Sequence, residues 1–171
     1  PAKSAILMVN SDYSNNSGNL KNCYALFNAA YSEDCAYGNA VNYSNNCFDN
    51  SHIQHVELSY GNLLTARSSR VFFSHAIGGS SDIYFSKDLR GCSNCFGCVN
   101  LRNKHYHIFN KPYSKEKYRA KLAEFDTGSY VSVQRILGRA YAFWLKFPNT
   151  FRESGTKSVN VSGEYVINSK N

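Results

Sequence analysis

The sequence predicts a mainly β fold, a narrow parallel β-solenoid with twelve residues per coil, accompanied by a two-helix insertion or cap. Two nested regularities predict the solenoid: small or aliphatic residues recur every twelve positions, and compact residues recur every three. Two amphipathic patterns of helical period after residue 104 predict the helices.

The twelve-residue repeat is clearest from Cys23 onward. Steps of twelve reach only small or aliphatic residues, namely Cys23, Cys35, Cys47, Ser59, Val71, Ile83 and Cys95. The positions halfway between them form a second uncharged column, namely Ala29, Val41, Ile53, Thr65, Ile77, Leu89 and Leu101. The quarter positions are also compact, so every third residue from 23 to 101 is small or apolar.

A three-residue period fits neither an α-helix, with period 3.6, nor a half-buried strand, with period 2. It fits a chain that turns four corners per coil and points one compact side chain inward on each side. Equivalent positions then stack at about 4.8 Å, so seven coils form a rod roughly 30 Å long.

An aromatic ladder follows directly after the first inward column, with Ala36 as its one exception. Its members are Tyr24, Phe48, Tyr60, Phe72, Tyr84 and Phe96. By parity these side chains point away from the interior. One interpretation is a stack of rings on the surface, in which each aromatic contact stabilises the fold by about 1 kcal/mol. The other is an apolar stripe that another element or a partner covers. We expect coverage, with the helical segment as the nearest candidate, and predict a binding surface.

Asn and Asp precede the inward column at several points, namely Asn22, Asp34, Asn46, Asp82 and Asn94. Such side chains satisfy backbone groups at turns. We interpret them as corner residues and not as a functional site.

The first predicted helix begins after a turn at Lys111–Tyr113, with Ser114 as its N-cap. Tyr118, Leu122 and Phe125 then share one apolar face.

A second helix is predicted near residues 130–146, after a break at 126–128 and before Pro148. Its predicted buried stripe contains Tyr130, Val133, Leu137, Tyr141 and Trp144. Two short amphipathic helices cannot bury their faces alone. We therefore expect them to cap the solenoid end or to lie on the aromatic ladder, which also protects the terminal strands.

The expected organisation has three parts: a solenoid at 1–104, a basic two-helix segment at 105–150, and a truncated second solenoid at 151–171. The second solenoid is indicated by Glu164–Ser169, which echoes Asp12–Ser17. Because the chain begins at Pro1 and stops inside this pattern, we expect it to be a piece of a longer protein.

The runs Lys21–Tyr24, Arg90–Lys104 and Tyr106–Glu116 resemble an uncharacterised cysteine-rich repeat family, found largely in predicted proteins of uncultured small-genome bacteria. The resemblance covers nearly the whole chain and is most specific between residues 90 and 118. It implies a bacterial source but no activity. Cysteines are usual in that family at three positions that here hold Ser59, Val71 and Ile83. These replacements favour packing over chemistry for the column.

The coil spacing also resembles the β-helix of beetle antifreeze proteins, in which Cys, Ser and Ala point inward. This resemblance implies a right-handed coil and, as one alternative, a disulfide between Cys92 and Cys98. The ice-binding threonine rows of that family are missing, since threonine occurs only at positions 65, 127, 150 and 156. Ice binding is therefore not expected.

The strongest metal-like pattern is Cys92, Cys95 and Cys98 followed by His107. Three thiolates and an imidazole suit tetrahedral zinc, and His107 lies twelve residues after Cys95. The cysteines also fall on inward columns, where thiols serve as compact apolar groups. Packing without a cofactor is the preferred interpretation, and zinc is the alternative.

Positive charge is concentrated in the helical segment. Residues 1–99 contain six Lys or Arg and seven Asp or Glu, whereas residues 100–157 contain twelve and four. A solvated helix surface is the preferred interpretation, and nucleic-acid or polyanion binding is the alternative. The candidate side chains are Lys115, Arg119, Arg135 and Arg139.

No catalytic pattern has supporting context, because Asp49, Glu57, Asp82 and Asp88 fall on different columns. The predicted function is a non-enzymatic structural or binding scaffold that contacts proteins or further copies of itself. Nucleic-acid binding is the second hypothesis, and a carbohydrate-active β-helix enzyme is the third. The chain contains no membrane-spanning run, and cysteines without a secretory signal favour the cytoplasm.

Overall fold

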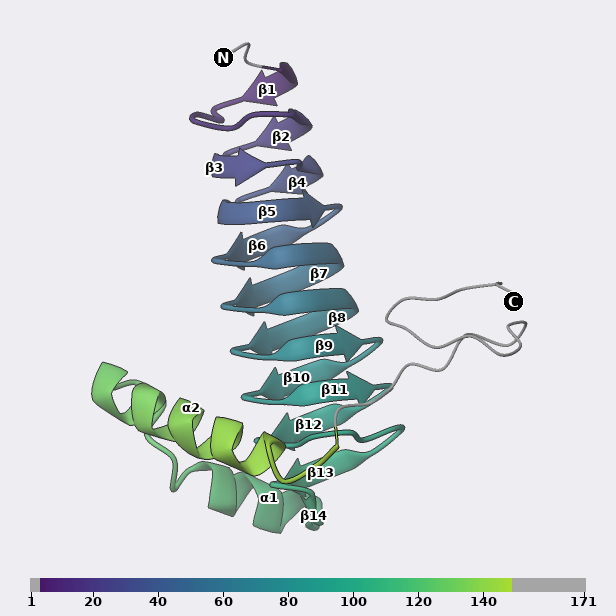
Figure 1. Cartoon of the computed structure of the whole chain (residues 1–171), viewed down its shortest axis with the longest axis vertical. Coiled ribbons are helices and arrows are strands. Elements are labelled where there is room, and N and C mark those ends of the chain that lie inside the picture. The colour runs from purple at the N-terminus through teal and green to yellow at the C-terminus, as the bar shows by residue number, and fades with distance from the viewer. Residues whose placement is uncertain (1–3, 149–171) are drawn as a thin grey trace, which may run out of the picture.

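A computed structural model describes residues 4–148 and confirms the predicted fold (Figure 1). It is a parallel β-solenoid of about nine coils with two helices, α1 at Lys115–Leu122 and α2 at Tyr130–Trp144. The strands of the coils are β1 (Ala5–Val9), β2 (Ser17–Lys21), β3 (Tyr24–Phe27), β4 (Ala30–Glu33), β5 (Ala36–Asn42), β6 (Asn45–Phe48), β7 (Ser51–Tyr60), β8 (Leu63–Phe72), β9 (His75–Gly78), β10 (Ser81–Tyr84), β11 (Lys87–Arg90), β12 (Ser93–Phe96) and β13 (His105–Ile108). A short strand, β14 (Lys111–Pro112), follows. The second solenoid predicted at 151–171 lies outside the described residues.

Successive coils pair in parallel with a constant offset of twelve residues. Ala5 pairs with Ser17 at one end of the solenoid, and Phe96 pairs with Ile108 at the other. The solenoid therefore begins well before Cys23, where the repeat becomes clear in the sequence. The boundary expected at residue 104 falls inside the last coil.

Each side of a coil consists of three residues with different backbone roles, which Tyr24, Ala25 and Leu26 illustrate. The N–H of the outward-facing Tyr24 donates to a carbonyl of the next coil (3.0 Å), and that of Ala25 donates to a carbonyl of the previous coil (3.0 Å). The N–H of Leu26 points into the solenoid and donates to Ser14 Oγ (3.2 Å). Because a buried N–H needs an acceptor, the interior favours residues whose side chains accept hydrogen bonds.

The corner residue of each side has a left-handed backbone, with φ between 45° and 65°. Asn, Asp and Gly tolerate this conformation better than other residues. All five predicted corner residues adopt it, which confirms their place in the coil: Asn22, Asp34, Asn46, Asp82 and Asn94. Corner side chains also link coils, since Asn22 Nδ2 donates to Asp34 Oδ1 (3.0 Å).

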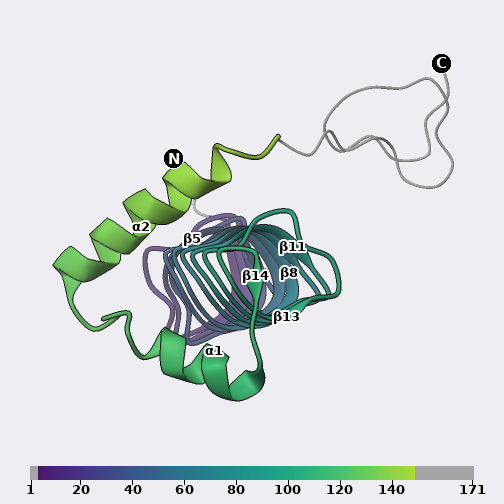
Figure 2. The same ribbon diagram turned by 90° about the horizontal axis from the view of Figure 1, so that it is seen from below.

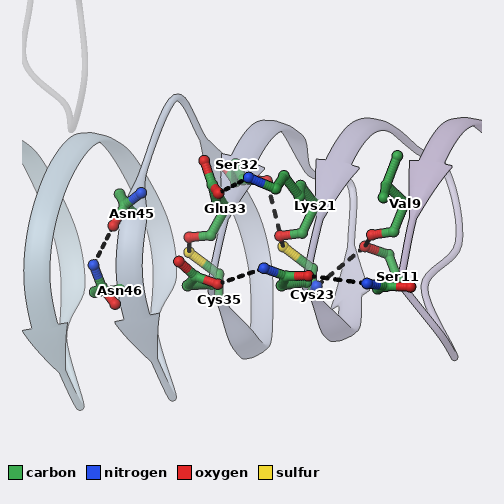
Figure 3. Close-up of polar contacts among 12 residues, drawn as sticks. Val9, Ser11, Lys21, Cys23, Ser32, Glu33, Cys35, Asn45 and Asn46 are labelled. Carbon is green, nitrogen blue, oxygen red and sulfur yellow. Dashed lines mark hydrogen bonds and ion pairs between the residues drawn. The ribbon is translucent and has the colours of Figure 1, made fainter.

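Serine and cysteine side chains connect successive coils inside the solenoid (Figure 3). Ser11 Oγ accepts a hydrogen bond from the N–H of Cys23 (3.1 Å) and donates to the carbonyl of Val9 (2.8 Å). Cys23 Sγ donates in turn to the carbonyls of Lys21 (3.2 Å) and Ser32 (3.4 Å). The buried side chains thus pair backbone groups that water does not reach.

Two asparagines continue this bonding in the middle coils. The N–H of Asn62 donates to Asn50 Oδ1 (3.0 Å), and the N–H of Ser74 donates to Asn62 Oδ1 (2.9 Å). The inward column from Ala29 to Leu89 is instead almost wholly aliphatic, and each of its side chains is at most 2% exposed. The interior therefore combines a polar ladder with a thin apolar core.

The C-terminal end of the solenoid is followed by a short hairpin and the two helices. β14 pairs antiparallel with β13, and α1 begins at the predicted N-cap, where Ser114 Oγ accepts from the N–H of Lys117 (3.3 Å). In the break before α2, Asp126 Oδ1 accepts from the N–H of Gly128 (3.0 Å). Both predicted helices and the break between them are confirmed. Within residues 4–148, neither helix has the length and apolar character that crossing a membrane requires.

The predicted buried stripe of α2 is wrong at two tyrosines. Tyr130 and Tyr141 are 77% and 60% exposed, whereas Val133, Ile136 and Ala140 are buried. These three residues, spaced i, i+3 and i+7, form the contact side of α2, and this orientation turns both tyrosines outward.

Ser44 provides a test of the polar ladder, because its Oγ accepts from the N–H of Val56 (3.3 Å) and donates to the carbonyl of Asn42 (2.8 Å). Ser44→Ala is expected to lower the free energy of unfolding by about 1–3 kcal/mol, measured by urea denaturation, because it leaves a buried N–H without a partner. Ser44→Cys keeps a bonding side chain and is expected to cost less. Equal losses for both variants would contradict this role.

Gly38 tests how tightly the interior is packed. A Cβ at this position would meet Val41 Cγ2 at 2.6 Å and the carbonyl oxygen of Asn50 at 3.0 Å. Gly38→Ala is therefore expected to lower the free energy of unfolding by about 1–3 kcal/mol. Gly18→Ala is the matched control, since its Cβ would have ordinary contacts, the nearest at 3.4 Å. An unchanged stability of Gly38→Ala would show that this point is not tight.

Candidate functional site

The aromatic ladder lies on the outside of the solenoid, with its members in register in neighbouring coils. Phe48 pairs with Tyr60, and Phe72 pairs with Tyr84. The rings of Phe72 and Tyr84 are stacked, with centroids 5.4 Å apart and planes 9° apart. Ala36 leaves a gap after the first ring of the ladder.

A second aromatic column, not predicted, occupies the neighbouring corner. Its members are Tyr13, Tyr37, Phe73, Phe85 and Phe109. Its rings meet the ladder edge to face: the Tyr24 and Tyr37 centroids are 5.6 Å apart, and those of Tyr60 and Phe73 are 5.2 Å apart. The same twelve-residue spacing could have revealed this column, but Ala25, Asp49, Gly61 and Gly97 interrupt it. We call the two columns together the aromatic face.

The helices cover the last coils of the aromatic face. Phe85 and Phe96 are 1% and 0% exposed because they belong to a cluster with Tyr118, Val133 and Ile136 of the helices. Figure 2 shows both helices lying beside the coils. The predicted coverage of the ladder by the helical segment is therefore confirmed for its C-terminal end.

The N-terminal part of the aromatic face is open. Tyr24, Phe48 and Tyr60 are 43%, 43% and 41% exposed. Helix α2 extends sideways from the solenoid (Figure 1), and its outer side adds further exposed side chains, namely Tyr130, Val131, Tyr141 and Leu145. A hydrogen bond to Asp49 and, to a smaller extent, the nearby Tyr130 raise the pKa of the Tyr60 hydroxyl. We call the three open rings and these exposed side chains together the open aromatic surface.

A separate stack of rings lies on a different corner. Tyr31 and Tyr43 are parallel within 7° at a centroid distance of 4.9 Å, and His55 continues the stack at 4.9 Å and 14°. This stack is also exposed. It contains fewer rings than the aromatic face and has no helix beside it in the contacts of the described residues.

The basic residues predicted on α1 lie beside a carboxylate. A hydrogen bond from its own backbone N–H, followed by one from Ser114 and by the charges of Lys115 and Arg119, lowers the pKa of Glu116. Part of the positive charge at Lys115 and Arg119 is therefore offset locally.

The basic residues predicted on α2 are also accompanied by acidic groups. Arg135 and Arg139 border a pocket of about 300 Å³ that Glu124 and Asp126 also line. The guanidinium of Arg139 lies 4.5 Å from the ring centroid of Phe109, so it packs against the last coil. Polyanion binding through these four basic side chains stays a prediction.

The cysteine and histidine candidates gain no support as a zinc site. Among residues 4–148, no group of three or more His, Cys, Asp or Glu side chains is arranged to hold a metal ion. All six cysteines are free, so Cys92 and Cys98 form no bridge. The thiols of Cys92, Cys95 and Cys98 donate to backbone carbonyls, and His107 Nδ1 donates to the carbonyl of His105 (2.7 Å). This donor set fits packing and backbone bonding better than zinc coordination.

Two of the four carboxylates considered for catalysis, Asp82 and Asp88, are paired with arginines of neighbouring coils. Asp82 accepts two hydrogen bonds from Arg70 in the preceding coil (2.6 and 2.8 Å), and Asp88 accepts two from Arg102 (2.9 and 3.0 Å). Such paired contacts hold neighbouring coils in register.

The six thiols are expected to be unreactive in the folded protein. Each is at most 2% exposed. The hydrogen bond to Cys23, followed by that to Cys47 and by burial, raises the pKa of the Cys35 thiol, and contact with Cys95 and burial raise that of Cys92. A hydrogen bond with Cys35 instead lowers the pKa of the Cys23 thiol to about 7. Burial, which keeps reagents away from all six sulfurs, is therefore the reason to expect low reactivity.

Ellman's reagent measures this directly. We expect its reaction with the folded chain to be at least about 100-fold slower than with the chain in denaturant, because reaction requires unfolding. Rapid modification of any thiol in the native chain would show that the interior opens locally.

No protein-family model matches the chain, and no curated protein matches it significantly. The two resemblances that the sequence suggests therefore stay predictions. The open aromatic surface is the feature of this solenoid that its geometry best equips for recognition.

Proposed function

We propose that the chain is a non-enzymatic scaffold whose open aromatic surface binds a second copy of the chain side by side. The observation that carries this proposal is the exposed row of Tyr24, Phe48 and Tyr60. Exposed aromatic side chains provide large contact areas at low entropic cost and are typical of interface hot spots.

The repeat spacing makes this surface complementary to itself. Equivalent rings follow one another at the strand spacing of about 4.8 Å, or at multiples of it. In a two-fold interface the same row lies opposite, so its rings have the same period. The gap at Ala36, between Tyr24 and Phe48, offers room for a ring of the second copy.

The rest of the molecule supports a passive role. Hydrogen-bonded Ser, Cys and Asn side chains and aliphatic residues fill the interior, and ion pairs such as Arg70 with Asp82 link the coils. A rigid support lets a surface bind without an ordering cost.

Removal of two open rings tests the proposal. Sedimentation velocity is expected to show concentration-dependent dimers of the wild type. The double variant Phe48→Ser/Tyr60→Ser is expected to associate at least about ten-fold more weakly, because hot-spot rings contribute about 2 kcal/mol or more.

The matched control is Tyr31→Asn/Tyr43→Asn, which removes two exposed rings from the separate stack at positions whose left-handed backbone suits Asn. This control is expected to dimerise like the wild type. A wild type that stays monomeric at all concentrations, or a control that weakens association equally, would contradict the proposal. Circular dichroism of each variant separates loss of association from loss of fold.

A further inference from the structure

A groove of about 730 Å³ runs along the side of the solenoid half a coil away from the aromatic ladder. Its floor follows one outward column, in which neighbouring members pair in register: Asn42, Gln54, Ala66, Gly78 and Arg90. One wall contains His52, Leu64 and Ala76, and the other contains Arg67 and Gly79.

The groove exists because two floor residues lack bulk. Ala66 and Gly78 occupy positions at which the same column carries Gln54 before them and Arg90 after them. A Cβ on Gly78 would lie 3.9 Å from Arg90 Cγ, so the Arg90 side chain lies next to this open floor.

Two guanidinium groups on the groove have no partner. Within residues 4–148, neither Arg67 nor Arg90 makes a side-chain hydrogen bond or ion pair. By contrast, Arg102, the next member of the floor column, is paired with Asp88 (2.9 and 3.0 Å). Among the described residues, none that lines the groove is Asp or Glu. The groove thus presents two positively charged side chains that form no ion pair among the described residues.

We propose that this groove binds a linear acidic oligosaccharide. Arg67 directly follows the floor residue Ala66, and Arg90 occupies the floor position two coils further on, roughly 10 Å along the axis by the strand spacing. This separation suits two anionic groups along one sugar chain. The amides of Asn42 and Gln54 at the other end suit sugar hydroxyls, which both donate and accept hydrogen bonds. Leu64, Ala66 and Ala76 supply apolar surface for the C–H faces of sugar rings.

The lining favours a sugar chain over a nucleic acid. Single-stranded nucleic acids are bound by aromatic rings on which bases stack. The residues that line the groove include no Tyr, Phe or Trp among those described, and the molecule's aromatic rings lie on other sides of the coil.

Isothermal titration calorimetry with tetragalacturonate tests the proposal. Arg67→Asn and Arg90→Gln are each expected to weaken binding about ten-fold, because each removes a charge-assisted contact. Ala66→Phe fills the floor without changing charge and is expected to abolish binding.

Arg70→Asn is the matched control for Arg67→Asn. Both residues have a left-handed backbone, with φ of 52° and 48°, but Arg70 lies outside the groove and is paired with Asp82. The control is expected to bind like the wild type. An equal loss in Arg70→Asn would show general charge attraction and overturn the proposal, as would no measurable binding of tetragalacturonate.

Two further probes define the ligand class. A neutral glucose tetrasaccharide is expected to bind much more weakly, and equal binding would overturn the role of the arginines. A single-stranded DNA tetramer is also expected to bind more weakly, and tighter binding that depends on Arg67 and Arg90 would assign the groove to nucleic acid. The variant Phe48→Ser/Tyr60→Ser, which tests self-association, is expected to bind the sugar as the wild type does. The two proposals can therefore be tested independently.

Discussion

The structure depends on the backbone N–H that each three-residue side of a coil turns toward the interior. Two of the three N–H groups of a side bond the neighbouring coils, as at Tyr24 and Ala25, and the third faces the interior of the solenoid. Where the residue twelve positions earlier is Ser or Asn, its side chain accepts this third N–H, as Ser14 does for Leu26 and Ser44 for Val56. The interior therefore contains hydroxyl and amide groups as well as aliphatic ones. The buried cysteines contribute to the same bonding from the other side, because their thiols donate to backbone carbonyls, as Cys23 does to those of Lys21 and Ser32.

The narrow interior also determines where the aromatic residues lie. A channel in which Gly38 has no room for a methyl group cannot accept a ring, so Phe and Tyr are confined to the outer side of the coils and to their corners. The helices bury part of this apolar material, including Phe85 and Phe96, and the remainder is exposed toward the N-terminal coils. A solenoid of this width has only its surfaces with which to recognise other molecules.

Much of the fold could be predicted from the sequence, because its rules are local. The columns through Cys23 and Ala29 can be recognised in the sequence because only compact residues fit inward. Helix α1 could be located by its N-cap, Ser114. The first coil lies within the predicted solenoid, but its columns were not traced, because Ala5–Val9 is a continuous apolar run in which a three-residue period cannot be seen. The orientation of α2 was partly wrong because its contact side depends on Phe85 and Phe96, which are distant in sequence.

The candidate sites were harder to predict from the sequence, because each depends on which neighbouring side chains leave a residue uncovered or unpaired. The aromatic ladder follows from spacing, but its division into covered and open parts depends on where the helices pack. The groove depends on the missing side chain of Gly78, and its charge depends on a lining that contains Arg67 and Arg90 but, among the described residues, no carboxylate. These properties arise only when residues of different coils are brought together.

The constant offset of twelve residues makes the length of this molecule adjustable in discrete steps. Insertion or removal of one whole coil would shift α1 and α2 along the axis by one strand spacing, about 4.8 Å, and every remaining side chain would keep its direction. A change of one residue would instead turn inward side chains out for the rest of the solenoid. The fold therefore acts as a molecular ruler, in which evolution can change the separation between the first coil and the helices without redesigning either.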